Sequence, residues 1–150
     1  LTMLTPKGVI HQELFRDNLC CLVRVDSPLL KRDWQLNTYM EAGHLQVKSG
    51  DDKWLLDYKL ADKGLERDIV MTVPDFNCAA NVCRVTDLIL TAPRRYEDHI
   101  ATLYHLTILP LPFDVPELSY SLFWHEYMEK DLAHKWLREL IMSKCVDSMA

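Results

Sequence analysis

The chain has 150 residues, a hydrophobic content of 49% and a formal net charge of −5. This composition is typical of a soluble globular protein with one domain or two small lobes. The acidic balance argues against nucleic-acid binding by this chain alone, because phosphate contacts need clustered lysines and arginines and the one dense basic spot is Arg94–Arg95.

The predicted elements alternate between strands and helices. A run of branched and apolar residues at 13–25 predicts one long strand or two collinear strands. Further strands are predicted at 44–48, 68–73, 87–92, 106–112 and 118–125. Helices are predicted at 33–43, 49–64, 76–84, 94–104 and 132–145.

Polar residues and glycines mark the expected helix ends. Asp33 and Gly43 suit the start and the end of the first helix, and Ser49 and Gly64 suit those of the second. Asp75 follows a strand and suits the N-cap of the third helix.

Strands near 44, 68 and 87 alternate with helices at intervals of about 20 residues, which predicts βαβ units and a parallel sheet. The strands at 13–25 and 106–112 lie outside this rhythm. They suit crossings between two lobes, and a single sheet with irregular edges is an equally good alternative.

The stretch 121–140 is rich in histidine and acidic residues but matches no metal or catalytic pattern. His125-Glu126 lacks the second histidine of the HExxH zinc motif, and His134 lies beyond a predicted strand-to-helix break. Asp131 suits the cap of an amphipathic helix in which Trp136 belongs to the apolar stripe. The stretch therefore indicates packing.

Other templates of enzyme chemistry are also missing from the sequence. It has neither a G-x-S-x-G motif nor a glycine-rich phosphate loop. A small α/β enzyme would have to use Ser49 with Asp75, and no histidine is placed to link them. We therefore expect no enzymatic activity, no cofactor and no metal site.

The cysteines and the hydropathy pattern indicate a cytoplasmic location. The five cysteines form no C-x-x-C pair and leave an odd count, which is typical of reduced, buried thiols. No apolar run approaches the roughly 20 residues of a membrane span, and the first residues do not form a signal peptide. We expect no membrane partner.

A ligand site is expected at the carboxyl ends of the strands, where open α/β sheets bind their ligands. There Ser49 can donate a hydrogen bond, Asp75 can accept one and Phe76 can form an aromatic wall. Taken singly, Ser49 and Asp75 are better explained as helix caps than as ligand-binding residues. Because both are expected at the same sheet edge, a ligand site becomes as good an explanation as two caps. The predicted ligand-binding residues are Val47, Lys48, Ser49, Asp75, Phe76 and Thr91.

Several segments resemble the C-terminal half of LysR-type transcriptional regulators. They are "TDLILTAPRR" and "ILPLPFDVPELSYSLFWHEYMEKDLAHKWLREL", and the similarity is closest to the branch that responds to small aromatic or flavonoid inducers. "GVIHQELFRDNLCCLVRVDSPL" resembles the crossing strand of the family, and "VPDF" resembles its loop at the ligand cleft. Together the similarity runs over nearly the whole chain.

The resemblance implies an α/β, periplasmic-binding-protein-like fold of two Rossmann-like subdomains joined by crossing strands. Residues 16–103 would form the second subdomain, and 1–15 with 104–150 would belong to an incomplete first subdomain. The implied function is inducer sensing by a homodimeric or tetrameric transcription factor. DNA would be bound only through a winged helix-turn-helix domain with no counterpart in this chain.

Two further points qualify this expectation. A periplasmic-type solute-binding protein has the same two-lobed plan and is the alternative. The position of Asp75 is commonly histidine in the branch that binds aromatic acids, and Asp51 and Asp52 add negative charge nearby. We therefore expect a neutral or cationic inducer.

Overall fold

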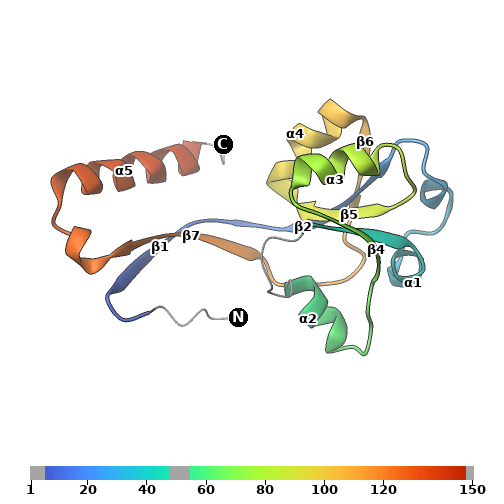
Figure 1. Cartoon of the computed structure of the whole chain (residues 1–150), viewed down its shortest axis with the longest axis horizontal. Coiled ribbons are helices and arrows are strands. Elements are labelled where there is room, and N and C mark those ends of the chain that lie inside the picture. The colour runs from blue at the N-terminus through green and yellow to red at the C-terminus, as the bar shows by residue number, and fades with distance from the viewer. Residues whose placement is uncertain (1–5, 48–54, 148–150) are drawn as a thin grey trace. The chain divides into compact units, whose positions relative to one another are not determined.

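Residues 6–47 and 55–147 are described by the computed structural model of the chain (Figure 1). Their contacts divide into two compact units. The smaller unit contains the described residues up to Asp17 and from Glu117 onward, and the larger contains those of Asn18–Pro116. The described strands form two separate sheets, of two and five strands, so the alternative of a single sheet is wrong.

The larger unit is built on the five-stranded sheet, whose order is β4-β3-β5-β2-β6. Its strands are β2 (Leu19–Arg24), β3 (Gly43–Val47), β4 (Asp68–Val73), β5 (Ile89–Pro93) and β6 (Leu106–Pro110). As predicted, β3 is parallel to both β4 and β5. The sheet is mixed because β2, which is not part of a βαβ unit, runs antiparallel to β5 and β6.

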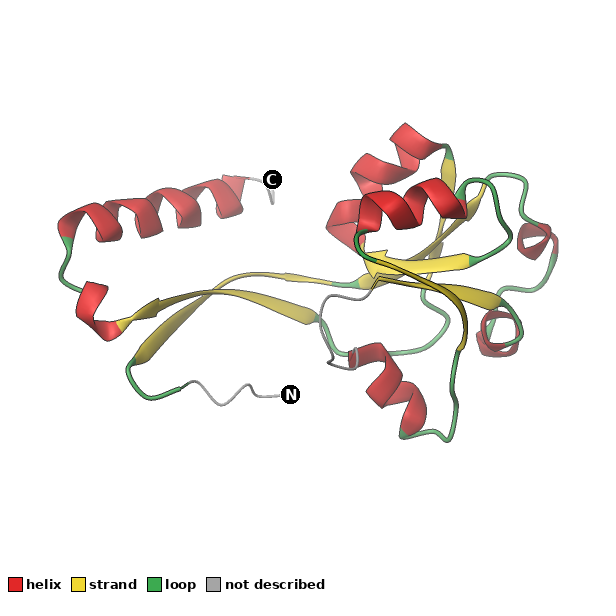
Figure 2. Ribbon diagram, viewed as in Figure 1, coloured by secondary structure: helices red, strands yellow, loops and turns green. Residues whose placement is uncertain are grey.

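Helices cover both faces of this sheet (Figure 2). On one face lie α3 (Phe76–Cys83) and α4 (Arg94–Tyr104), and α2 (Leu55–Ala61) lies on the other. Tyr39, in α1 (Leu36–Met40), also contacts this second face. A short 3-10 helix, η1 (Pro28–Lys31), follows β2.

Alternation along the strands separates two kinds of buried side chain. Leu22, Leu45 and Leu90 point toward α3 and α4 and form the apolar core with alanines of those helices. Their sequence neighbours Cys21 and Thr91 point toward α1 and α2, because successive strand residues face opposite sides of a sheet. One face of the sheet is therefore apolar and the other carries polar groups.

Several predicted helix ends agree with the structure. Asp75 caps α3 by accepting a hydrogen bond from the Cys78 backbone N–H at 2.8 Å. Gly64 has a φ of 70° in the turn after α2, and the Leu65 N–H donates to the Leu60 carbonyl at 2.9 Å. The predicted start of this helix at Ser49 lies outside the described residues.

The first predicted helix is shorter than expected. It covers only Leu36–Met40, with Gln35 as N-cap residue, and the Asp33 carbonyl accepts a hydrogen bond from the Thr38 hydroxyl. Gly43 does not end this helix but begins β3. A Cβ atom there would lie 2.7 Å from a Val70 methyl group and 2.8 Å from a Leu88 methyl group, so a larger residue would force both side chains to shift.

The smaller unit consists of one antiparallel strand pair and one long helix. Its elements are β1 (Val9–Asp17), β7 (Leu118–His125), the 3-10 helix η2 (Glu126–Met128) and α5 (Leu132–Asp147). Stacked rings of Phe15 and Tyr120, 4.7 Å apart, join the strands. The Asp131 carboxylate accepts the His134 N–H at 2.7 Å and caps α5 as predicted.

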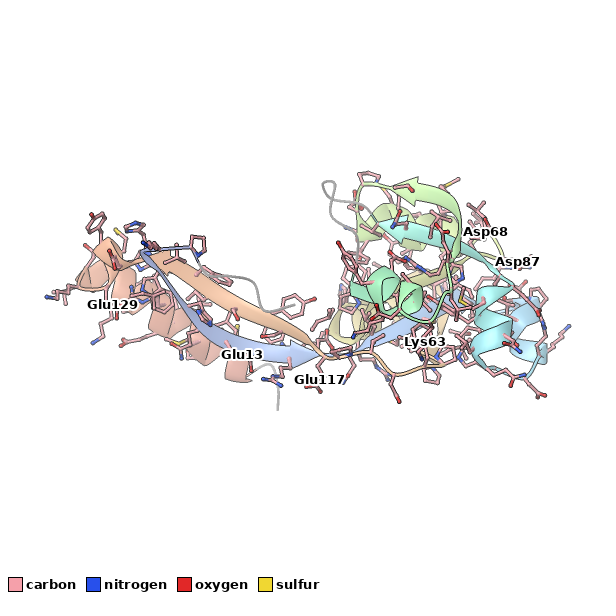
Figure 3. The ribbon with its side chains drawn as sticks, turned by 90° about the horizontal axis from the view of Figure 1, so that it is seen from below. Glu13, Lys63, Asp68, Asp87, Glu117 and Glu129 are labelled. Atoms are coloured by element: carbon pink, nitrogen blue, oxygen red, sulfur yellow. The ribbon has the colours of Figure 1, made fainter. Side chains whose placement is uncertain are left out.

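An arginine ties α5 to the strand pair. The Arg138 guanidinium lies 4.7 Å from the centre of the Trp124 ring and donates to the carbonyls of Met128 and Glu129. Glu129 is labelled in Figure 3. The predicted apolar stripe of α5 is not buried, since Trp136 is 64% exposed. Two strands and one helix offer too little apolar surface to cover it.

Candidate functional site

The carboxyl ends of the parallel strands of the larger unit lie at one edge of the sheet. β6 shares their direction because β2 is antiparallel to both β5 and β6. β2 therefore begins at this edge, where Leu19 pairs with Pro93 and Cys20 pairs with Pro110. Asp68 and Asp87, labelled in Figure 3, mark the opposite end of β4 and β5. The edge is the place where the sequence predicts a ligand.

Asp75 and Val47 lie at the β3–β4 end of this edge. Val47 pairs with Val73, the last residue of β4, and is half-buried. The hydrogen bonds that the Asp75 carboxylate accepts from the Cys78 N–H and thiol lower the pKa of Asp75. Asp75 is exposed, so it presents a negative charge to solvent while it caps α3.

Phe76 contributes to the contact between α3 and α4. Its half-buried ring lies 4.9 Å from the ring of Tyr96, and the Tyr96 hydroxyl donates to the Asn77 side-chain carbonyl at 3.1 Å. Phe76 also packs against the apolar core. The ring of Tyr96 therefore restrains the ring of Phe76, whose role as an aromatic wall stays a prediction.

Thr91 lies beneath the edge rather than on it. Its side chain is buried on the α1–α2 face, and its hydroxyl is hydrogen-bonded to the Tyr39 hydroxyl at 3.0 Å. The Cys21 thiol lies 3.9 Å from the same hydroxyl, and burial raises the pKa of Cys21 to about 12. The remaining predicted residues, Lys48 and Ser49, lie outside the described residues.

The polar face continues into a network that sequence reasoning missed. The His44 Nε2 donates to the Tyr39 carbonyl at 2.9 Å, and burial lowers the pKa of His44 to about 4, with a further contribution from Arg67. The Arg67 side chain is only 2% exposed and pairs with Asp57 at 2.8 Å. His44 is therefore a neutral imidazole at physiological pH.

This network holds two buried nitrogen atoms without a hydrogen-bond partner among the described residues, His44 Nδ1 and Arg67 Nη2. Arg67 Nη2 contacts the Asp57 carboxylate, but it does so outside hydrogen-bond geometry. Because its Nε2 carries the proton, neutral His44 presents an acceptor at Nδ1, whereas Arg67 presents a donor. No signal in the sequence predicts this network, because its members come from four separate segments.

A pocket of about 340 Å³ opens at the other end of the edge, where β5, β2 and β6 meet. It is lined by Asn18–Cys20, Arg94, Pro110–Leu111 and Phe113–Val115. Most of these residues are apolar, and the charged side chains are those of Arg94 and Asp114. This mixture is typical of small-molecule sites.

Contacts with the α1–α2 side hold the outer wall of the pocket in place. The Phe113 ring packs edge-on to Tyr39 at 5.5 Å, and Lys63 Nζ lies 5.8 Å from the centre of the same ring. The Trp34 indole N–H donates to the Pro110 carbonyl at 2.7 Å. The wall is thus preorganised, although it belongs to a segment without regular secondary structure.

The pocket residues were not predicted from the sequence. Leu19, Cys20, Arg94 and Pro110 lie at the ends of β2, α4 and β6, and the other lining residues lie outside helices and strands. The available signal was the two prolines at 110 and 112, since prolines rigidify a ligand-lining loop. The described residues contain no group of three candidate metal ligands and no helix that is long and apolar enough to cross a membrane.

The chain is similar to known proteins over most of its length. A family model described as "LysR substrate binding domain" matches residues 2–146. The HTH-type transcriptional activator NahR of Pseudomonas putida is 32% identical over 141 residues, which cover 93% of this chain and 47% of NahR. The chain therefore spans about half the length of this relative.

Solved structures agree with the family match. The probable transcriptional regulator PA0477 from Pseudomonas aeruginosa has a TM-score of 0.84 and 28% identity, over 93% of this chain and 46% of that one. The regulatory domain of MexT, a transcriptional activator in Pseudomonas aeruginosa, has a TM-score of 0.76 and 26% identity, over 92% of this chain and 68% of that domain.

These matches confirm the predicted fold class, a periplasmic-binding-protein-like α/β domain that this chain covers in part. The named relatives are transcription regulators, not enzymes. The chain belongs to the LysR substrate-binding domain family.

Proposed function

We propose that the chain is the small-molecule-sensing part of a LysR-type transcriptional regulator. The pocket of about 340 Å³ at the carboxyl edge of the larger sheet carries the proposal. Family membership supports it, and the relatives are regulators rather than solute-binding proteins. DNA binding would require a winged helix-turn-helix domain outside this chain.

The proposal includes the cytoplasmic location, homodimeric or tetrameric assembly and the implied subdomain ranges, 16–103 for the second and 1–15 with 104–150 for the first. It also includes inducer sensing in a cleft between the subdomains. The resemblance of the "TDLILTAPRR" segment to the aromatic-responsive branch supports an aromatic inducer.

In this proposal the ligand site extends along the whole carboxyl edge. Val47, Asp75 and Phe76 form its β3–β4 end, and Lys48 and Ser49, which lie outside the described residues, stay predicted members. The pocket forms the β5–β2–β6 end. Support for a single site comes from the sheet itself, because the carboxyl ends of β3, β4, β5 and β6 all lie at this edge.

The charge of Asp75 supports a neutral or cationic inducer. The hydrogen bonds that cap α3 stabilise the carboxylate and lower the pKa of Asp75, so the group is ionised at neutral pH. An exposed carboxylate at the edge repels an anionic ligand, although solvent weakens this repulsion.

A thermal-melt screen tests the sensing function. Small molecules that bind the folded chain raise its melting temperature by mass action. We expect such ligands to stabilise the wild-type chain but not Val115→Trp, which fills the pocket with a bulky ring. Ligands that stabilise both proteins equally, or a broad library without a stabilising compound, would contradict the proposal.

Matched aromatic probes test the charge of the inducer by calorimetry at neutral pH. Salicylamide is expected to bind more tightly than salicylate, which has the same ring and a negative charge. Asp75→Ala should reduce the difference in affinity between salicylamide and salicylate. The same variant should lower the free energy of unfolding by about 1 kcal/mol, because it removes the cap of α3. Tight binding of salicylate to the wild-type chain would overturn the charge assignment, and loss of folded Asp75→Ala would show that the residue acts as a cap.

A further inference from the structure

We propose that the pocket at the β5–β2–β6 end binds a small zwitterion with an apolar side chain, that is, an amino acid or a molecule with the same charge pattern. This inference rests on the proposed sensing function and deepens it, because it names the chemical class of the ligand.

The two charged residues of the pocket have opposite signs. Arg94 is the first residue of α4, and Asp114 lies in the segment after β6. A guanidinium matches the two oxygens of a carboxylate, whereas an aspartate accepts hydrogen bonds from an ammonium group. A zwitterion offers an oppositely charged group to each of these two lining residues.

A ligand with a single charge does not meet both demands. An anion would face the Asp114 carboxylate, and a cation would face the Arg94 guanidinium. Like charges that are brought together disfavour binding, so the same pair of residues that attracts the zwitterion disfavours either singly charged analogue.

The position of Arg94 at the start of a helix supports the assignment of the ligand carboxylate to the Arg94 side of the pocket. The amino end of α4, an 11-residue helix, carries a partial positive charge that favours an anionic group on that side. The Arg94 backbone N–H donates to the Asn18 carbonyl at 2.8 Å, which fixes this wall against the start of β2. The ligand carboxylate would therefore be directed toward Arg94 and its ammonium toward Asp114.

The rest of the pocket suits an apolar side chain. Leu19, Leu111, Phe113 and Val115 supply aliphatic and aromatic surface, and Tyr39 holds the Phe113 ring in place. The volume of about 340 Å³ lies at the small end of the range for ligand pockets, about 300–1,000 Å³. It suits a molecule with one branched or aromatic side chain rather than a peptide or nucleotide.

The charge pattern is also compatible with Asp75 elsewhere on the edge. A zwitterion has no net charge, so an exposed carboxylate repels it less than it repels an aromatic acid. The expectation of a neutral or cationic inducer and the presence of an arginine in the pocket are therefore consistent with one ligand class.

Calorimetry on the whole chain with matched analogues tests the proposal. Leucine and phenylalanine would each be titrated as the free amino acid, the cationic amide, the anionic N-acetyl acid and the neutral N-acetyl amide. We expect at least one free amino acid to bind about tenfold or more tightly than its three analogues, because each loses at least one charge-assisted contact.

Charge-neutral variants should change the order of preference. Arg94→Gln should weaken binding of the free amino acid and strengthen binding of the cationic amide relative to it. Asp114→Asn should instead strengthen the relative binding of the anionic N-acetyl acid. Arg84→Gln and Asp62→Asn remove exposed charges that do not line the pocket and should leave the order unchanged. If either pocket variant fails to fold, Val115→Trp replaces it and should abolish amino-acid binding.

Three results would overturn the inference: binding of neither free amino acid, equal binding of the neutral N-acetyl amide, or equal binding to wild type and Val115→Trp. These results are distinguishable from a failure of the sensing function. If other compounds still stabilise the wild type but not Val115→Trp in the thermal screen, the pocket remains a sensor and only the zwitterion assignment is wrong.

Discussion

The two faces of the five-stranded sheet bury different kinds of side chain. The face under α3 and α4 is lined by Leu22, Leu45 and Leu90 and has an apolar core. The face under α1 and α2 buries a polar network around Tyr39 and Thr91, and Tyr39 also supports the wall of the pocket. Both faces contribute to stability, since Ile89, the neighbour of Leu90, is also fully buried and faces the other side. The second face differs in adding buried hydrogen bonds around a tyrosine that contacts the wall of the pocket.

The largest effect is expected on the apolar face. Leu90→Ala should lower the free energy of unfolding by about 4 kcal/mol, because a fully buried leucine leaves a cavity when it is truncated. Leu103→Ala is the control, since Leu103 is 60% exposed on α4 and its truncation should cost about 0.5 kcal/mol or less. Urea denaturation measures both. A small loss for Leu90→Ala would show that the apolar core on this face contributes little to stability.

The second effect is a pH dependence that arises on the polar face. The folded chain holds the pKa of His44 at about 4, below its ordinary value of 6.5. The unfolded chain therefore binds this proton first, and stability should fall as the pH is lowered from 6.5 toward 4. This pKa difference corresponds to a total loss of about 3 kcal/mol in the free energy of unfolding once His44 is protonated in both the folded and the unfolded state.

Histidine variants assign this pH dependence. His44→Gln should flatten the fall in stability between pH 6.5 and 4.5, a window in which the carboxylates contribute less than they do at lower pH. His99→Gln, at an exposed position on α4, should leave the slope unchanged. Identical slopes for the wild type and His44→Gln would rule out His44 as the source.

The smallest effect is expected at the hydrogen bond beneath the ligand edge. Thr91→Val keeps the shape of the side chain but removes the hydroxyl partner of Tyr39, and should cost about 1–2 kcal/mol because both groups are buried. Thr91→Ser retains a hydroxyl and provides the comparison. A loss for Thr91→Ser that exceeds the loss for Thr91→Val in urea denaturation would show that packing of the methyl group, rather than the hydrogen bond, is important here.

Local signals predicted the regular part of the fold. β3, β4 and β5 follow from apolar runs bounded by turn residues, and the cap of α3 follows from Asp75 after the end of a strand. Gly43 was assigned to the end of a helix, although tertiary contact with Val70 and Leu88 explains it. Such contacts join residues that are far apart in sequence, so no periodic pattern in the sequence predicts them.

The same reason limits prediction of the site. Asp75 and Phe76 were placed at the edge because they follow a strand directly. The network of Tyr39, Thr91 and Arg67 was not foreseen, because each hydrogen bond or ion pair depends on how the chain folds back. The pocket was missed because its outer wall comes from a connecting segment, where neither strand nor helix periodicity constrains the side chains.

Methyl-resolved NMR of the chain, titrated with the most stabilising ligand from the thermal screen, tests the central claim most directly. Leu19, Leu111 and Val115 line the pocket, whereas Leu22, Leu45 and Leu90 lie in the apolar core. The account predicts saturable shift changes that are largest at the pocket methyl groups and small in the core. Changes that are largest in the core, with none at the pocket, would contradict it.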